Sequence, residues 1–375
     1  MSKSVVIIDA NDVIANGGLE VLVRHANYAS SLKIASNQNF QLVLIGTKGL
    51  QDLLGQHKDK VGSDLIVHAI KETKFRRIFF WKQPFKVLRE NQISPTLLVA
   101  GDPWVSGCNT ILVKKLLKGT SKIQIQLHAD LFAPGWRNSS LTNFIKYQIA
   151  RRVILRADYI RTVSLHQTKN LSPYVVNGQL VSCIPIPLST NSRVKQNNSK
   201  DFKTFGFFGR LQSDRGTEFV IDKFALLLRA HRDIHLVIAG SGSDEKLIKN
   251  KLKMKFPNQV KMLGHLSTEQ SQIFWNQIDV LLSVAEYESF GRAPREAILN
   301  HVPVLATPSS GIFDLIESPI GEWVSLVSRD IDSEELLNQA RKIFHHVQLL
   351  PKPNFELDLQ DSVHKLVMNW IEIVS

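Results

Sequence analysis

The feature that most constrains the fold of this chain is the repetition of short apolar runs, each followed by a polar turn and a helical pattern. The first run, Ser4–Ala10, is rich in β-branched residues, as buried parallel strands are. Residues 19–32 then repeat apolar side chains at helical spacing. Further strands are predicted over 40–46, 96–102, 123–130 and 159–164. Strands that alternate with helices predict a doubly wound α/β domain.

A break in this pattern occurs at residues 184–203, which begin with two prolines and continue with polar and charged residues, as linkers do. Strand and helix signals then restart. Strands are predicted over 204–210, 235–242, 260–264, 279–286 and 302–308, and helices over 216–230, 244–255, 294–300 and 361–375. The sequence therefore predicts two Rossmann-like α/β domains, residues 1–190 and 191–360, followed by a C-terminal helix, 361–375. We expect a ligand at the carboxyl ends of the strands, in a cleft between the domains.

Composition narrows the class of protein. The 375 residues are 43% hydrophobic and 21% charged, as in soluble globular proteins. Two cysteines, Cys108 and Cys183, are too few for a disulfide framework or a cysteine-rich zinc site. The N-terminal apolar run is short for a signal peptide, and no run approaches a membrane span of roughly 20 residues. We therefore expect a cytoplasmic protein.

Charge is divided unevenly along the chain. Residues 1–190 carry 24 Lys and Arg against 11 Asp and Glu, whereas the remainder carries 22 against 23. Two interpretations stay open: the first half meets an anionic partner, or its charge serves solubility. Lys71–Glu90 adds five aromatic residues to seven basic ones, and Lys146–Arg156 is also basic. Such stretches suit an anionic membrane surface, or they are helices with buried aromatics and a solvated basic face. No nucleic-acid recognition motif is present, and we expect no such partner.

Two segments of the second half could hold phosphate. Arg210 and Arg215 flank a predicted turn between a strand and a helix, where guanidinium groups can bind a diphosphate bidentately. The turn Gly240-Ser241-Gly242 lets a ligand approach the backbone. Each segment also fits an ordinary surface turn.

The sequence EYESFGRAPREAIL, Glu286–Leu299, is more specific. Pro294 favours a helix that begins near Arg292, so Glu288 lies in the preceding loop and Glu296 in the first turns. Gly291 would expose backbone amides at a helix N-terminus, where an anion is favoured. The amides could bind a phosphate and the two carboxylates could bind hydroxyls. A nucleotide-sugar carries both groups, so the sequence predicts such a ligand.

The first half offers two weaker signals. Gly17-Gly18 precedes a predicted helix, and His128 follows a predicted strand in the sequence HAD. A lone histidine is more often structural than catalytic, but a loop at a strand end favours a role in the site.

In their order and spacing these motifs resemble a known family over nearly the whole chain: the GT-B glycosyltransferases of the large retaining family 4, the glycosyl transferases group 1. The matching segments are Gly17-Gly18, His128, Ala157-Asp158 through Ser164, GRLQSDRG, Glu288 with Glu296, and PVLAT. Members usually have lysine where Arg215 stands, and a glycine pair and glutamate where this chain has only Gly311 and Asp314.

The resemblance implies a role for each candidate residue. Arg210 and Arg215 would hold the donor diphosphate, Glu288 the sugar hydroxyls and Glu296 the ribose, while His128 would line the reaction centre. The remaining donor-binding candidates are Gly17, Gly18, Gly209, Gly240, Gly242, Gly264, Phe290, Gly291 and Arg292. No metal or other cofactor is expected, and the C-terminal helix would pack on the first domain.

The function expected from this resemblance is transfer of a sugar, with retention, from a nucleotide-diphosphate-sugar to a glycan or lipid-linked acceptor. The first domain would bind the acceptor and the second the donor. The enzyme would act in cell-surface polysaccharide or glycolipid synthesis, either free in the cytoplasm or peripheral on the inner face of the cell membrane. Two alternatives remain: a non-catalytic protein that binds nucleotide-sugars or anionic glycans, and a sugar-nucleotide epimerase of similar fold.

Overall fold

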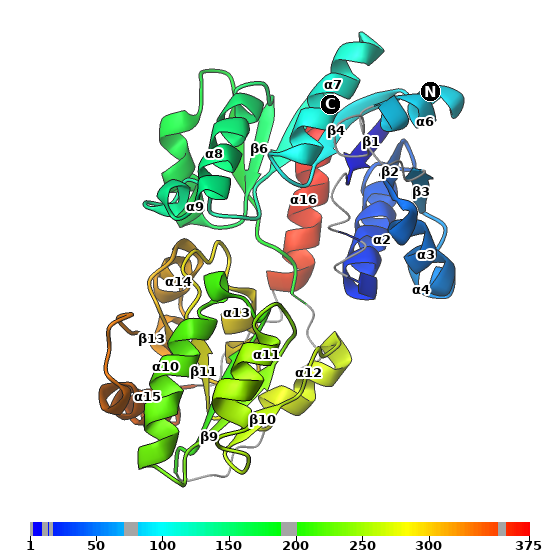
Figure 1. The fold of residues 1–375 in the computed structure, drawn as a ribbon. Helices are drawn as coiled ribbons and strands as arrows, with labels where there is room; N and C mark the ends of the chain where they lie inside the picture. The colour runs from blue at the N-terminus through cyan, green and yellow to red at the C-terminus, as the bar shows by residue number, and fades with distance from the viewer. Residues whose placement is uncertain (1–2, 10–13, 15–17, 71–81, 189–200, 352–357) are drawn as a thin grey trace. The chain divides into compact units, whose positions relative to one another are not determined.

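The computed structural model describes residues 3–9, 14, 18–70, 82–188, 201–351 and 358–375. They form two compact units, which are described separately: unit 1 contains Met1–Pro187 and Gln360–Ser375, and unit 2 contains Leu188–Leu359 (Figure 1). Gly17, most of the predicted linker and residues 71–81 of the basic aromatic stretch lie outside the described residues. No helix in the described part of the chain is long and apolar enough to cross a membrane.

Unit 1 is built on a parallel sheet of seven strands in the order β3-β2-β1-β4-β5-β6-β7. Its strands are β1 (Lys3–Ile8), β2 (Phe40–Thr47), β3 (Leu65–Ile70), β4 (Pro95–Ala100), β5 (Lys122–Gln126), β6 (Tyr159–Thr162) and β7 (Leu180–Cys183). Its helices are α2 (Gly18–Ala35), α3 (Lys48–Gln56), α4 (Lys58–Val61), α6 (Lys82–Glu90), α7 (Val105–Leu117), α8 (Leu141–Ile154), α9 (Leu165–Leu171) and α16 (Asp358–Val374), with 3₁₀ turns over Trp136–Asn138 and Ser172–Tyr174.

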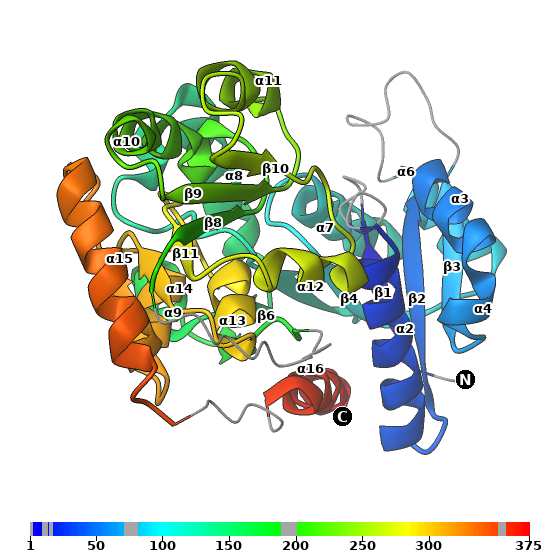
Figure 2. The ribbon, with the colours of Figure 1, turned by 90° about the horizontal axis from the view of Figure 1, so that it is seen from below.

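Both faces of the central strands in unit 1 are buried, which explains their continuous apolar sequence. On β1, Val5 and Ile7 pack with α2 and α16, whereas Val6 and Ile8 pack against the side that includes α6 and α7. The C-terminal helix α16 lies beside α2 in both views (Figures 1 and 2). Its Trp370 is fully buried, and the indole Nε1 donates to Gln124 Oε1 on β5 at 2.8 Å.

Unit 2 has a parallel sheet of six strands in the order β10-β9-β8-β11-β12-β13. Its strands are β8 (Thr204–Phe208), β9 (His235–Ala239), β10 (Val260–Met262), β11 (Val280–Ser283), β12 (Val304–Ala306) and β13 (Val324–Leu326). Its α-helices are α10 (Thr217–Ala230), α11 (Glu245–Ile248), α12 (Thr268–Trp275), α13 (Arg292–Leu299), α14 (Ser310–Ile316) and α15 (Ser333–Val347). Two 3₁₀ turns cover Ser213–Arg215 and Gly321–Trp323, and a π-helix covers Lys249–Lys253.

The predicted doubly wound α/β architecture is confirmed in both units. Strand order in unit 2 reverses between β8 and β11, because the chain builds outward from β8 through β9 to β10 and then from β11 through β12 to β13. Ligands of open α/β sheets bind outside the carboxyl ends of the strands at such a reversal. The loops that follow β8 and β11 therefore occupy the position in unit 2 where a ligand is expected.

Candidate functional site

The loop after β8 is shaped by backbone contacts that only glycine permits. Gly240, at φ +133°, lies so close to the β8 loop that a Cβ atom would be 1.7 Å from the Gly209 carbonyl oxygen. A Cβ on Gly242 would be 2.3 Å from the Leu211 oxygen, and Leu211 N donates to Ser241 O at 2.9 Å. The two predicted phosphate segments, Gly209–Arg215 and Gly240–Gly242, are thus one packed structure.

Gly264 joins the same structure from β10. Its carbonyl accepts a hydrogen bond from Gly240 N at 2.7 Å, and its φ of +70° favours glycine. Gly264 therefore lies beside the Gly240 turn, at the carboxyl ends of neighbouring strands.

The two predicted diphosphate ligands differ in their surroundings. Arg210 is exposed, and its side chain makes no hydrogen bond or ion pair within the described residues. Arg215 closes the 3₁₀ turn before Gly216 and donates from Nη1 to Glu288 Oε2 at 2.9 Å. Arg215 therefore connects the loop after β8 with the loop after β11.

Glu288 is the centre of the second loop. Its Oε2 accepts from Arg215, its Oε1 accepts from Gly291 N at 3.2 Å, and its backbone oxygen accepts from Gly311 N at 2.8 Å. These contacts orient the carboxylate beside the first residues of α13. The amide of Gly291, which we expected to face a phosphate, is used by Glu288 in this structure.

The predicted helix start is confirmed: α13 begins at Arg292, with Gly291 as N-cap at φ +73° and Pro294 in the first turn. Glu296 is on this helix and is only 8% exposed. Its Oε1 is 2.6 Å from Nε of Arg292, one turn earlier. The two glutamates thus lie in different environments. Glu288 is in a loop beside Arg215, and Glu296 is on a helix beside Arg292.

Two contacts in this region were not predicted from the sequence. The Arg295 guanidinium lies 4.1 Å from the centroid of the Phe290 ring, and its Nη1 donates to Gly311 O at 3.4 Å. A Cβ on Gly311 would lie 2.5 Å from the Phe290 carbonyl carbon. Both contacts fix the loop of Glu288 against the start of α14. The only sequence signal for Arg295 is its position one turn after Gly291.

The candidates of unit 1 lie in a separate environment. Gly18 is the first residue of α2, at φ +71°. His128 follows β5; its side chain is exposed, and Nε2 is 3.2 Å from Gln126 Oε1. The protein around the imidazole, and then the positive charges of Arg161 and Arg24, lower the pKa of His128 below its ordinary value. The imidazole is therefore neutral at neutral pH.

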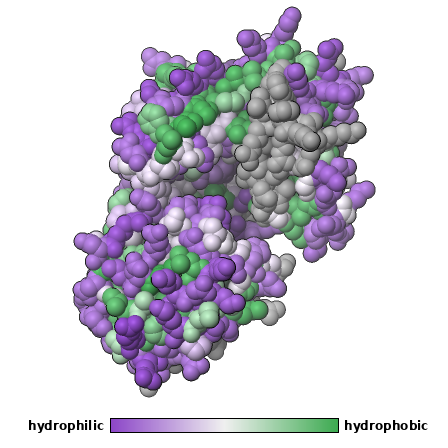
Figure 3. Space-filling view, viewed as in Figure 1, coloured by the Kyte–Doolittle hydropathy of each residue, from purple (hydrophilic) through white to green (hydrophobic). Residues whose placement is uncertain are grey.

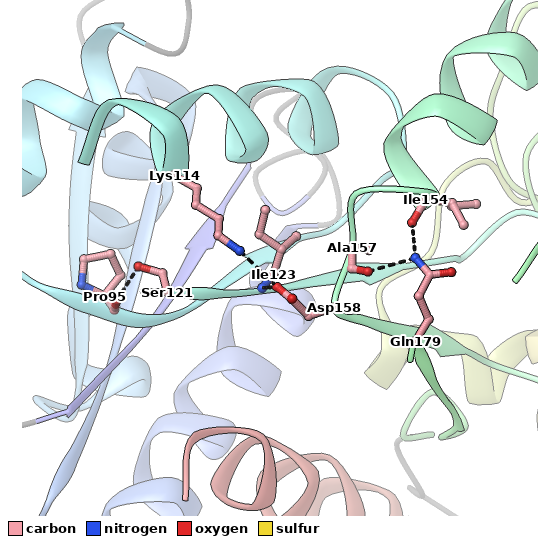
Figure 4. Close-up of polar contacts among 8 residues, drawn as sticks. All are labelled: Pro95, Lys114, Ser121, Ile123, Ile154, Ala157, Asp158 and Gln179. Carbon is pink, nitrogen blue, oxygen red and sulfur yellow. Dashed lines mark hydrogen bonds and ion pairs between the residues drawn. The ribbon is translucent and has the colours of Figure 1, made fainter. Parts of the chain in front are cut away.

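Asp158 belongs to the family-like segment Ala157–Ser164 and has a structural role. It lies at the amino-terminal end of β6, away from the carboxyl ends of the strands. It precedes β6, accepts from Ile123 N at 2.7 Å and pairs with Lys114 of α7 at 3.2 Å (Figure 4). Gln179 completes this end by donating to the oxygens of Ile154 and Ala157 (Figure 4). Ser164, at the other end of the segment, caps α9 by accepting from Gln167 N.

The described residues contain no group of three or more His, Cys, Asp or Glu side chains placed to hold a metal ion. The expectation that no metal is required stays a prediction. The loops that follow β8 and β11, with the start of α13, bring together arginine side chains, carboxylates and a backbone amide.

Comparisons with known proteins relate unit 2 to a described family. Residues 189–345 match the family described as Glycosyl transferases group 1. The chain is 26% identical over 174 residues to mannosylfructose-phosphate synthase of Agrobacterium fabrum (strain C58), covering 44% of this chain and 38% of that protein. It is 29% identical over 132 residues to GDP-mannose-dependent alpha-mannosyltransferase of Mycolicibacterium smegmatis, covering 35% of this chain and 32% of that protein. The chain thus spans well under half the length of these curated relatives.

Solved structures extend the likeness to the whole chain at the level of fold. Anabaena Alr3699/HepE, solved in complex with UDP-glucose, superposes with a TM-score of 0.68 at 16% identity, covering 98% of this chain and 99% of that one. These comparisons place residues 189–345 with the glycosyl transferases group 1 and give the chain the fold of the GT-B glycosyltransferases.

Proposed function

We propose that this protein is a retaining glycosyltransferase of family 4, which transfers a sugar from a nucleotide-diphosphate-sugar to a glycan or lipid-linked acceptor. In this proposal unit 2 binds the donor and unit 1 the acceptor. The family match to residues 189–345 supports the donor assignment, because it covers the unit that contains the candidate site.

One observation carries the proposal. Arg215 and Glu288 are 2.9 Å apart although they belong to loops 73 residues apart, and they meet where the strand order of unit 2 reverses. The start of α13 contributes backbone amides and Glu296 to the same loops. A nucleotide-sugar needs cations for its diphosphate and carboxylates for its hydroxyls, and these two loops of unit 2 supply both.

The proposed roles follow from this chemistry. The bond between the anomeric carbon and the diphosphate oxygen breaks, and the acceptor hydroxyl oxygen bonds to that carbon on the same face. The hydroxyl proton passes to the departing diphosphate. Arg210, Arg215 and the N-terminus of α13 would stabilise the charge that develops on the departing diphosphate. Glu288 would hold sugar hydroxyls and Glu296 the ribose. His128, being neutral, would line the reaction centre as a hydrogen-bonding group.

The identity of the donor is proposed only as a class. One curated relative is named for GDP-mannose, and one solved structure contains UDP-glucose. Cell-surface polysaccharide or glycolipid synthesis is the proposed setting, on the cytoplasmic side of the membrane. The nucleotide is the first property that a ligand panel would resolve.

Replacement of Glu288 by Gln tests the proposal. It keeps the size of the side chain but removes the carboxylate, so we expect kcat/KM for transfer to fall by about a hundredfold or more. Glu286→Gln is the matched control, because Glu286 is exposed and lies only two residues earlier. Its kcat/KM should change by less than about threefold, the range of a surface substitution.

Equal turnover of the Glu288→Gln variant and the wild type would contradict the role assigned to Glu288. Two further results would favour the alternatives. Tight donor binding without transfer to any acceptor would indicate a binding protein. Inversion of a hydroxyl centre in the donor itself would indicate an epimerase. An anomeric NMR spectrum of the product tests retention directly.

A further inference from the structure

The surface of unit 1 carries an apolar stripe on two neighbouring helices. On α8 the exposed apolar residues follow at helical spacing, from Leu141 at 77% exposure through Phe144 and Ile145 to Leu155 just after the helix. On α7, Leu112 and Leu116 are exposed one turn apart. We call these six residues the α7–α8 face: Leu112, Leu116, Leu141, Phe144, Ile145 and Leu155. Figure 3 shows apolar atoms gathered over this side of unit 1.

The two helices are held together closely enough to present one surface. A Cβ atom on Gly107 of α7 would lie 2.6 Å from Val153 Cγ1 of α8, so the helices pack at a glycine. The indole Nε1 of Trp104, just before α7, donates to Lys146 O on α8 at 3.0 Å. The Lys146 ammonium lies 5.0 Å from the centroid of the same ring system. The α7–α8 face is therefore a rigid part of unit 1.

The exposed charges on these two helices and on the chain between them have one sign. Between Asp102 and Asp158 the only acidic residue is Asp130, which is 1% exposed. The same stretch contains nine Lys and Arg residues. Five of them are exposed on α7, on α8 or directly after these helices: Lys115, Lys118, Arg151, Arg152 and Arg156.

We propose that the α7–α8 face seats unit 1 on an anionic lipid bilayer surface. Exposed leucine, isoleucine and phenylalanine side chains would enter the boundary between headgroups and acyl chains, while the surrounding cations contact anionic headgroups. Charge complementarity selects this partner, because no exposed carboxylate from these helices opposes an anionic surface. A nucleic acid would use the cations but not the apolar stripe, since such interfaces are mainly polar.

Vesicle sedimentation tests the proposal without requiring donor or turnover, so its failure is distinct from failure of the proposed function. We expect the protein to sediment with phosphatidylcholine–phosphatidylglycerol vesicles at low salt, and much less with phosphatidylcholine alone or at high salt. The double variant Phe144→Asp, Ile145→Asp should lower the partition coefficient by about tenfold or more, since it removes two inserted side chains and adds two negative charges.

The control variant carries the same chemical change on exposed apolar residues of unit 2. Leu226 is 62% and Met254 67% exposed, so Leu226→Asp with Met254→Asp should sediment like the wild type. Arg152→Glu with Arg156→Glu is a second test that keeps the apolar side chains, and it should weaken binding to anionic vesicles only. Thermal unfolding checks that each variant is folded.

Three results would overturn the proposal. The wild type could fail to bind anionic vesicles at low salt, or the Phe144 and Ile145 variant could bind as well as the wild type. Light scattering could instead show a dimer that this variant dissociates, in which case the α7–α8 face is covered by a second copy of the chain.

Discussion

At Arg215, the contribution of charge to donor affinity can be separated from the contribution of side-chain geometry. Members of the family that this chain resembles usually have lysine there, and Arg215 Nη1 contacts Glu288 at 2.9 Å. A lysine keeps the cation but loses the planar, bidentate donor arrangement. We expect Arg215→Lys to weaken donor binding by about tenfold or less, and Arg215→Ala by about a hundredfold, as for loss of a charge-assisted hydrogen bond.

Titration calorimetry with the donor would measure this difference. The unit 2 cation Lys261, which contacts Gln277 and not the site loops, supplies the control Lys261→Ala. Equal affinities of Arg215→Lys and Arg215→Ala would show that charge at this position is not used.

Gly311 tests the backbone geometry of the site. Its missing Cβ would lie 2.5 Å from the Phe290 carbonyl carbon, so Gly311→Ala must displace the loop that carries Glu288. We expect a loss of about 1–3 kcal/mol in the free energy of unfolding, together with weaker donor binding. Gly55→Ala, where a Cβ meets nothing within 4 Å, should not destabilise the protein. Unchanged stability and donor binding in Gly311→Ala would contradict the close approach of these loops.

The sequence predicted the placement of Glu288 and Glu296 because local signals are sufficient there. Pro294 and Gly291 define the start of a helix within a few residues, and the glutamates fall on either side of it. The contact of Arg295 with Phe290 and the ion pair of Arg215 with Glu288 were not predictable in this way. These contacts depend on how separate loops pack together, and the spacing of residues along the chain does not specify that packing.

At the level of elements, α16 is the helix whose contribution is most easily measured. Trp370 is fully buried against unit 1, whereas Met368 on the same helix is 43% exposed. We expect Trp370→Ala to reduce the free energy of unfolding by about 3–5 kcal/mol, the cost of removing a large buried side chain, with a further cost for the unpaired Gln124. Met368→Ala should cost well under 1 kcal/mol.

Denaturant unfolding followed by circular dichroism measures both variants. Similar small losses for Trp370→Ala and Met368→Ala would mean that α16 does not pack on the sheet of unit 1. Such a result would contradict the hydrogen bond from Trp370 to Gln124.

Some elements departed from the sequence prediction for local reasons. The helix predicted over 244–255 is a short α11 followed by a π-helix at Lys249–Lys253, a hydrogen-bond pattern that apolar periodicity does not specify. The strands β3, β7 and β13 were not predicted. β7 and β13 have only four and three residues and no fully buried position, so their neighbours in the sheet define them.

For the whole molecule, the partly buried His25 gives the free energy of unfolding a pH dependence. Burial lowers the pKa of His25 from 6.5 to about 4, so the folded protein binds fewer protons than the unfolded chain between these values. The contribution of His25 to the free energy of unfolding is therefore fully present above its ordinary pKa of 6.5, and it is lost as the pH falls toward the pKa of the folded protein, about 4. Thermal unfolding as a function of pH should show a smaller decrease for His25→Gln than for the wild type; an identical decrease would exclude His25 as a source.

Binding of a nucleotide-diphosphate-sugar by unit 2 is the central claim, and calorimetry with a panel of UDP-, GDP- and ADP-sugars tests it most directly. We predict that one nucleotide class binds the wild type, and that Glu288→Gln combined with Glu296→Gln weakens it by about a hundredfold, two lost hydrogen-bonded carboxylates at about tenfold each. The Glu286→Gln control should bind like the wild type. Binding of no member of the panel to the wild type, or equal binding by the double variant, would contradict the account.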